Sequence, residues 1–277
     1  MNAYQKVRAG LAMLWLPIAV LAAAWVATAA ADSFYFPTPP VILEALIDGF
    51  RQDHLWDDLV FSVRNIGVAV LLGSAAAVCV GLIIGESRAL THATAPFLTF
   101  ARATPMVAFI PIFIITFGIG AAPKIIVIAI GVFWPVLLNT ITGIRGIHPA
   151  VRETAVSFRI PKLLYLRRIV LPGAAPQIFA GLRIAIAVAL VLMVVSEIYG
   201  SSVGLGNYIL ESGARFQVAA TWAGTVVIGA LGYGLSSALI LLERRVLGWH
   251  QERPRKNSRP KRRGSPAVSG VFASRRG

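Results

Sequence analysis

Long apolar runs separated by short polar stretches dominate the pattern of this chain. Six of the runs approach or exceed the roughly 20 apolar residues that an α-helix needs to cross a bilayer. They are Leu11–Ala31, Ile66–Ile84, Ala103–Pro123, Ile125–Ile144, Pro176–Tyr199 and Val218–Leu242. The pattern therefore predicts an all-α polytopic membrane protein with six transmembrane helices.

Two of these runs are irregular. The third contains Pro105 and Pro111, which predict a kink or a late start. Only Pro123 and Lys124 separate it from the fourth, so we expect a tight helical hairpin there. The fifth contains Arg183 and Glu197, which lie roughly 21 Å apart along a helix and therefore cannot pair with each other.

Composition supports the membrane assignment. The chain is 57% hydrophobic and only 14% charged, whereas a soluble domain carries about 25% charged residues. Its one cysteine, Cys79, excludes an intramolecular disulfide. The sequence has no phosphate-binding loop of the GxxxxGK[ST] type and no metal-binding spacing. We therefore expect no catalytic, cofactor or metal site.

Charge bias predicts the orientation of the chain. Lys6 and Arg8 precede the first run, so the N-terminus is expected inside. The loop 32–65 is mainly acidic and is expected outside, whereas the stretch between the fourth and fifth runs is basic and is expected inside. Residues 251–277 are basic and rich in Pro, Ser and Gly, which predicts a disordered cytoplasmic tail that is attracted to anionic lipid.

The basic stretch 149–172 has amphipathic character. Pro149 can begin a helix, and helical spacing places Val151, Ala155 and Phe158 on one face. Pro161 predicts a break, after which a second helix is expected to end at Pro172. Such a segment suits either the inner membrane surface or a soluble partner, and the pattern alone leaves both interpretations open.

This stretch resembles the cytoplasmic coupling loop of the inner-membrane permease subunits of bacterial ABC importers, which has the form E-A-A-x3-G-x9-I-x-L-P. The matching positions are Glu153, Ala155, Ile169, Leu171 and Pro172. Thr154 replaces an alanine of the family, and Arg159 replaces its glycine. A left-handed turn is costly for arginine, so we expect Pro161 to make the turn instead.

Further short motifs look like the nitrate, sulfonate and taurine branch of these permeases, and the resemblance covers roughly residues 35–249. The motifs are Phe36–Pro40, Arg102–Pro105, Ile110–Phe113, Phe117–Gly120, Pro135–Thr140, Gly181–Ile184 and Val203–Gly206. The resemblance implies a type I permease fold over residues 1–250. It also implies a small anionic substrate such as a sulfonate, taurine or nitrate.

The same resemblance implies a set of partners. Two cytoplasmic ATP-binding subunits would drive transport, a second permease subunit, expected to be identical, would complete the path, and an extracytoplasmic solute-binding protein would deliver the substrate. The location is the bacterial inner membrane, with both termini in the cytoplasm. In this setting the coupling loop docks on the ATPase, and Glu153 either pairs with a basic group there or caps its own helix.

Charges inside spans are candidate functional groups, so Glu197 and Arg183 are predicted to lie on the translocation path; snorkelling at the two membrane boundaries is the alternative. We interpret Arg102 as an anchor at the inner start of the third span. An ATPase-independent secondary transporter or channel is the alternative function, but the inverted repeats typical of such proteins are not visible. Nucleic acid is not an expected partner.

Overall fold

The computed structural model describes residues 34–52 and 54–248, together with isolated positions between Trp15 and Thr28. All regular elements in these residues are helices, which confirms the all-α class. In chain order they are α2 (Pro39–Gln52), α3 (Leu55–Glu86), α4 (Arg88–Ala103), the 3-10 turn η1 (Met106–Phe109), α5 (Ile110–Phe117), α6 (Ala121–Arg145), α7 (Pro149–Ser157), α8 (Lys162–Tyr165), the π-turn η2 (Leu166–Val170), α9 (Leu171–Gly200), α10 (Leu205–Ala214) and α11 (Val218–Val246).

Four helical segments of this set are long and apolar enough to cross a membrane. They are α3, α6, the continuous segment Lys162–Gly200 and α11, and they correspond to the second, fourth, fifth and sixth predicted spans. The pair formed by α4 and the segment Met106–Phe117 is bent by 79° and would make a fifth. The first predicted span, Leu11–Ala31, falls mostly outside the described residues, so a total of six spans stays a prediction.

The third span has other bounds than the sequence suggested. The expected kink is confirmed, because α4 ends at Ala103 and the chain bends by 79° before η1 and α5. The bounds Ala103–Pro123 were wrong, because the bent pair runs from Arg88 to Phe117. Pro105 explains the bend, since a proline keeps the residue before it out of the helical region.

The expected hairpin turn at Pro123 and Lys124 was also wrong, because both residues lie in the first turn of α6. The break lies earlier, where Gly118 and Gly120 have φ values of 79° and 151°. A proline fits the first turn of a helix because the backbone N–H groups there have no partner within the helix. The local sequence therefore placed the break a few residues too late.

The acidic loop 32–65 that was expected outside is largely helical and is divided between α2 and the beginning of α3. Helix α3 begins at Leu55 rather than at Ile66. The polar residues Asp58, Ser62 and Asn65 on this added part are buried, so its polar face points into the protein and not toward water.

Pro172 does not end a helix. The segment Lys162–Gly200 is helical throughout, with the π-turn η2 immediately before Leu171 and Pro172. A proline inside a helix lacks an N–H group and crowds the carbonyl four residues earlier. The wider π-turn relieves that crowding locally, which is a common use of such turns.

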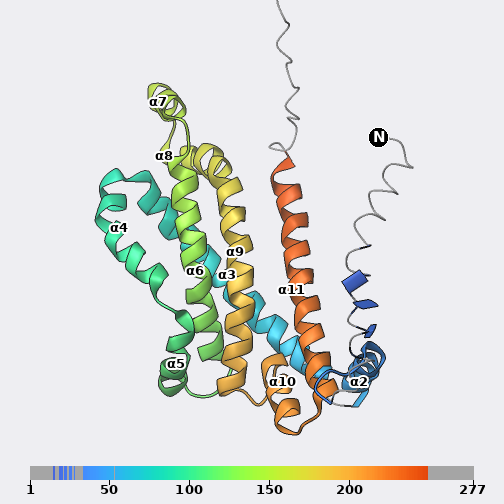
Figure 1. Cartoon of the computed structure of the whole chain (residues 1–277). Coiled ribbons are helices and arrows are strands. Elements are labelled where there is room, and N and C mark those ends of the chain that lie inside the picture. Colours follow the sequence, from blue (N-terminus) through green and yellow to red (C-terminus); the bar gives the residue numbers. More distant parts are fainter. Residues whose placement is uncertain are drawn as a thin grey trace, which may run out of the picture.

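Helix α6 occupies the centre of the bundle and packs on one side against α3 and on the other against α9 (Figure 1). The core between them is aliphatic, with Ile66, Ile128, Val132 and Met193 fully buried. Figure 1 shows α7 projecting at one end of the bundle and α2 and α10 at the opposite end, with α4 and α11 on its two sides. The molecule thus has two distinct ends joined by the spanning helices.

Small residues allow α3 and α6 to approach closely. A Cβ atom on Gly73 would lie 2.4 Å from the carbonyl oxygen of Ala129, and one on Gly81 would lie 2.6 Å from Thr140. Gly85 faces Ile144 in the same way. The glycines Gly73, Gly81 and Gly85 of α3 therefore serve helix packing within one subunit.

We predict that Gly73→Ala lowers the melting temperature of the detergent-solubilised protein. The added methyl must push α3 from the α6 backbone, and overpacking of this kind costs about 1–3 kcal/mol. Gly67→Ala is the matched control, because it lies on the same helix and a Cβ there meets nothing within 4 Å. Equal melting temperatures for the two variants would contradict the close approach.

Candidate functional site

Residues 149–170, which we call the elbow, form the tip of the molecule at the α7 end (Figure 1). Helix α7 is capped by His148, whose Nδ1 accepts a hydrogen bond from the N–H of Ala150 at 3.2 Å. The alternative that Glu153 caps this helix was therefore wrong. Glu153 is exposed, and its carboxylate has no hydrogen bond or ion pair within the described part of the chain.

Two helices of the core hold the elbow in place. The guanidinium of Arg152 donates to the carbonyl oxygen of Ile144 at 2.8 Å, near the end of α6. It also lies 3.5 Å from the carboxylate of Glu86, the last residue of α3. Ala155, a residue of α7, is buried. Because the last carbonyls of a helix have no partner within it, Arg152 joins α7 directly to the end of the bundle.

The turn after α7 is left-handed at Arg159, with φ of 49°. The N–H of Ile160 donates to the carbonyl of Ala155 at 3.0 Å, and the N–H of Arg159 donates to the carbonyl of Val156 at 2.9 Å. These two bonds define a Schellman motif, the usual left-handed end of a helix. The expectation that Arg159 avoids this conformation was wrong, because the two bonds offset a cost of about 1–2 kcal/mol.

Large apolar side chains are exposed at the tip of the elbow. Val156 and Phe158 are each 77% exposed and Leu163 is 78% exposed, with Arg159 and Lys162 between them. The sequence placed Phe158 on one face with Ala155, but the structure separates them, since Ala155 is buried. An apolar patch of this kind, rimmed by charge, is typical of a surface that binds another protein.

The predicted coupling residues fall into two groups. Glu153, Thr154, Ala155 and Arg159 lie on α7 and its turn. Ile169, Leu171 and Pro172 lie on the helical stem that leads into the span, where Ile169 and Pro172 are half-buried. Val156 and Leu163 were missed as candidates, although their apolar character beside basic residues was a usable signal.

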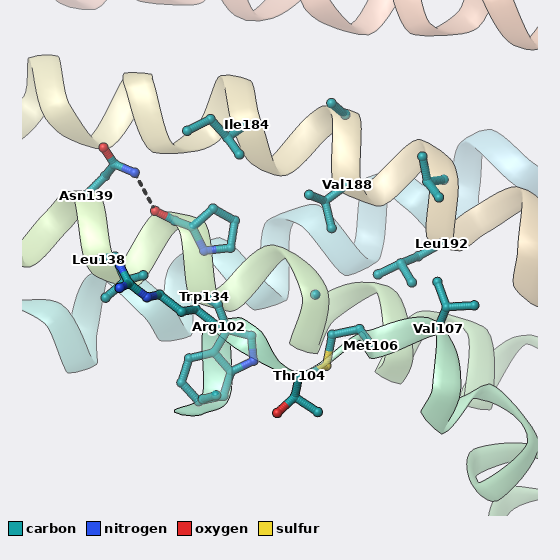
Figure 2. A pocket seen from close by; sticks show the side chains of 15 residues that line it. Arg102, Thr104, Met106, Val107, Trp134, Leu138, Asn139, Ile184, Val188 and Leu192 are labelled. Atoms are coloured by element: carbon teal, nitrogen blue, oxygen red, sulfur yellow. Dashed lines mark hydrogen bonds between the residues drawn. The ribbon is translucent and has the colours of Figure 1, made fainter. Parts of the chain in front are cut away.

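A second feature is a cavity of about 630 Å³ between α6, α9 and the junction of α4 with η1 (Figure 2). Its wall is contributed by residues 131–139 of α6 and 184–192 of α9, which lie halfway along both helices. Most of the lining is apolar. Arg102, Thr104 and Asn139 are the polar exceptions, and the Asn139 amide donates to the carbonyl of Pro135 at 2.8 Å.

The sequence suggested that Arg102 lies at the inner start of a span, but the structure places it elsewhere. It lies in the last turn of α4 and lines this mid-span cavity. Figure 2 draws it on the same side as Thr104 and Trp134, with Ile184, Val188 and Leu192 of α9 along the other side.

Glu197 is fully buried at the end of the molecule opposite to the elbow. Its carboxylate accepts hydrogen bonds from the hydroxyl of Ser62 at 2.8 Å and from the N–H of Gly206 at 3.0 Å. Ser62 in turn accepts from the N–H of Leu205 at 3.0 Å. Asp58 accepts from the N–H of Gly204 at 2.5 Å. We call this group the clasp, because it fastens the start of α10 to α3 and α9.

Gly204 is the residue that lets the clasp close. Its φ is 120°, and a Cβ atom there would lie 2.6 Å from the carboxylate of Glu197. Only glycine fits both the backbone conformation and the space. Nearby, the buried Lys124 donates to the carbonyls of Gly120 at 2.6 Å and Gly200 at 2.7 Å. The second bond satisfies a carbonyl at the C-terminal end of α9, which has no partner within the helix.

Arg183 and Glu197 do not contact each other, as expected. Arg183 pairs instead with Glu243 of α11 at 2.6 Å. Neither Arg183 nor Glu197 lines the cavity. A place on the translocation path therefore stays a prediction for both, and their observed contacts are those of residues that join helices.

The family model for the inner-membrane component of binding-protein-dependent transport systems matches residues 69–248. The chain belongs to this family and is a transporter subunit rather than an enzyme. It is thus a multi-pass protein of the inner membrane, and the family implies ATP-binding subunits and a solute-binding protein as its partners.

Several curated relatives are similar over most of their length. The putative aliphatic sulfonates transport permease protein SsuC of Bacillus subtilis is 32% identical, over 77% of both chains. The taurine transport system permease protein TauC of Escherichia coli is 30% identical, over 85% of this chain and 88% of that one. The bicarbonate transport system permease protein CmpB of Synechococcus elongatus is 31% identical, over 76% of each.

The fold is similar to that of a solved transporter. A chain from inward-facing conformations of the MetNI methionine ABC transporter aligns with a TM-score of 0.60 at 17% identity, over 70% of this chain and 98% of that one. At this identity the similarity shows the fold alone. It confirms the ABC importer permease fold that the sequence motifs implied.

We predict that Glu197→Ala destabilises the protein strongly. The change leaves the Ser62 hydroxyl and the Gly206 N–H buried without their acceptor, and each such group costs about 1–3 kcal/mol. Thermal unfolding in detergent measures the loss. Glu211→Ala is the control at the same end, because its exposed pair with Arg215 contributes less than about 1 kcal/mol. A loss no greater than that of the control would refute the clasp.

Arg159→Gly should keep the elbow turn and strengthen it by up to about 1 kcal/mol, because glycine has no steric cost in the left-handed region. Arg159→Val should weaken it, since a branched side chain is strained there. Hydrogen exchange of the amides of Arg159 and Ile160 reports the difference. Faster exchange in the glycine variant than in the valine variant would exclude the left-handed turn.

Proposed function

We propose that this member of the permease family is one subunit of an ATP-driven importer that takes up a small anion. The observation that carries the proposal is the elbow, a cationic projection with an exposed apolar tip that is tied firmly to the spanning bundle. Such a surface is suited to docking on a soluble subunit that supplies the energy.

The elbow can pass motion into the bundle. Arg152 links α7 to the ends of α3 and α6, and the stem of the elbow is continuous with the span up to Gly200. Displacement of the tip by closure of two ATP-binding subunits would move these helices together. A rigid-body switch between two packings then opens the path alternately to the two sides of the membrane.

A second copy of the chain is the best candidate to complete the path. Within one subunit, Ile184 and Val191 are 53% and 57% exposed at the rim of the cavity. Apolar residues could face lipid, but the charged Arg102 beside them would be costly there. A second, identical subunit facing this cavity would enclose a path between the two.

Charge distribution favours an elbow in the cytoplasm. Basic residues outnumber acidic ones at the elbow end, and acidic residues outnumber basic ones at the α2 and α10 end, which agrees with the positive-inside rule. At the elbow end the basic residues are Arg88, Arg145, Arg152, Arg159, Lys162, Arg167, Arg168, Arg244 and Arg245, and the acidic ones are Glu86, Glu153 and Glu243. At the other end the acidic residues are Glu44, Asp48, Asp57, Asp58 and Glu211, and the basic ones are Arg51, Arg64 and Arg215. Both termini would then be cytoplasmic, and the solute-binding protein would dock outside, on α2 and α10.

The substrate class rests on the relatives, whose names specify aliphatic sulfonates, taurine and bicarbonate. These compounds share an oxyanion group, so a small oxyanion such as a sulfonate, taurine, bicarbonate or nitrate is proposed for this chain. An ATPase-independent transporter or channel is the other candidate, but it would have no use for an exposed apolar tip at the elbow.

We predict that Phe158→Ala combined with Leu163→Ala weakens binding of the partner ATPase subunit at least tenfold. Loss of a large apolar side chain at the centre of an interface costs about 2 kcal/mol or more. Binding is measured between the permease in nanodiscs and the purified ATP-binding subunit of the same transporter. Phe100→Ala is the control, because Phe100 is 71% exposed but lies on α4, outside the elbow. Unchanged affinity of the elbow variant would contradict the proposal.

A further inference from the structure

Among the described residues, the only charge in the lining of the cavity is positive. Arg102 is the only charged residue among those that line it, and no aspartate or glutamate is present in that set. The remaining polar side chains are neutral. A cavity with this lining attracts anions and disfavours cations.

The depth of Arg102 makes its charge significant. The cavity lies beside the middle residues of α6 and α9, such as Trp134 and Val188, and is therefore far from either membrane boundary. A charge at that depth is costly unless it faces water, a partner or a ligand. Within the part of the chain that the structure describes, the guanidinium of Arg102 has no carboxylate partner and no hydrogen bond.

Among the other hydrogen-bond donors in the cavity lining, two bond to backbone carbonyls and one has no acceptor in the part of the chain that the structure describes. The hydroxyl of Thr104 donates to the carbonyl of Phe100 at 3.1 Å, and the amide of Asn139 donates to Pro135. The indole N–H of Trp134 is buried and has no acceptor among the described residues. The Arg102 guanidinium is thus an unused donor in the cavity lining, whereas the Trp134 N–H is enclosed by protein, and an oxyanion is the ligand that a free guanidinium binds.

We propose that Arg102 is the anion-selecting residue of the permease, contacting the oxyanion group of the substrate in the cavity. The proposal rests on the proposed function and adds a selection step inside the membrane, after that made by the solute-binding protein. An arginine suits this role because its planar guanidinium can donate two parallel hydrogen bonds to one oxyanion group.

A purely structural role for Arg102 is the competing explanation. It lies in the last turn of α4, where a positive charge is favourable to the helix dipole. That role predicts an effect on folding but no effect on the concentration of anions in the cavity. A measurement of local anion concentration therefore separates the two.

Trp134 provides that measurement as a fluorescent reporter in the same cavity. In a single-tryptophan variant of the full chain, Trp134 is kept and the other tryptophans are replaced by phenylalanine, namely Trp15, Trp25, Trp56, Trp222 and Trp249. Quenching by iodide, an anion, and by acrylamide, which is neutral, is then compared in nanodiscs at constant ionic strength. Thermal unfolding confirms that each variant is folded.

Arg102→Gln should lower the iodide quenching constant about fivefold, the factor that a unit charge about 4 Å away gives in water, and leave the acrylamide constant unchanged. Arg102→Lys should keep most of the iodide effect. Arg88→Gln is the matched control, because it removes the same charge from the exposed first residue of the same helix and should change neither constant. Sodium ethanesulfonate or sodium bicarbonate should relieve iodide quenching only where Arg102 is present.

Equal iodide quenching in the parent and in Arg102→Gln would overturn the proposal. A parallel change in acrylamide quenching would also overturn it, because the variant would then have rearranged the cavity. Failure of both ethanesulfonate and bicarbonate to relieve iodide quenching would show that the cavity does not bind oxyanions, which would also overturn the proposal. Since the nanodisc contains the permease alone, these outcomes do not depend on whether the elbow binds an ATPase.

Discussion

A polar group inside a bilayer must find its partners within the protein or along a water-filled path, and this constraint organises the whole bundle. The carboxylate of Glu197 meets it through Ser62 and the backbone of α10. Lys124 meets it through two backbone carbonyls, and Arg183 through Glu243 on α11. Each of these contacts also joins helices that are distant in sequence. Arg102 alone among these charges faces a cavity, which is why we propose that it contacts the substrate.

The same helices connect the elbow at one end of the molecule to the clasp at the other. The elbow is fixed at its base by Arg152, and its stem runs without interruption along α9 to the clasp at the other end. The cavity lies between these two fixed points, against the middle of α6 and α9. We propose that a displacement applied at the elbow is transmitted past the cavity to the clasp. The arrangement suits a transporter that receives energy at one face and binds its substrate-delivery protein at the other.

Features that depend on local sequence could be predicted. Apolar run length identified the helices α3, α6, α9 and α11, and Pro149 and Pro161 correctly marked the start of α7 and the break after it. Features that depend on tertiary contacts could not. Hydrogen bonds formed only on folding decide the left-handed Arg159 and the pairing of Ser62 with Glu197. The cavity position of Arg102 depends on a 79° bend whose direction no local pattern specifies.

The most direct test of the account is solute accumulation by reconstituted vesicles. The central claim is that this chain forms the path but receives its energy from a separate ATPase that docks on the elbow. Vesicles that contain the permease, its ATP-binding subunits, its solute-binding protein and ATP should concentrate the labelled solute that the binding protein carries. Vesicles that contain the permease alone should accumulate nothing. Concentrative uptake by the permease alone would contradict the claim.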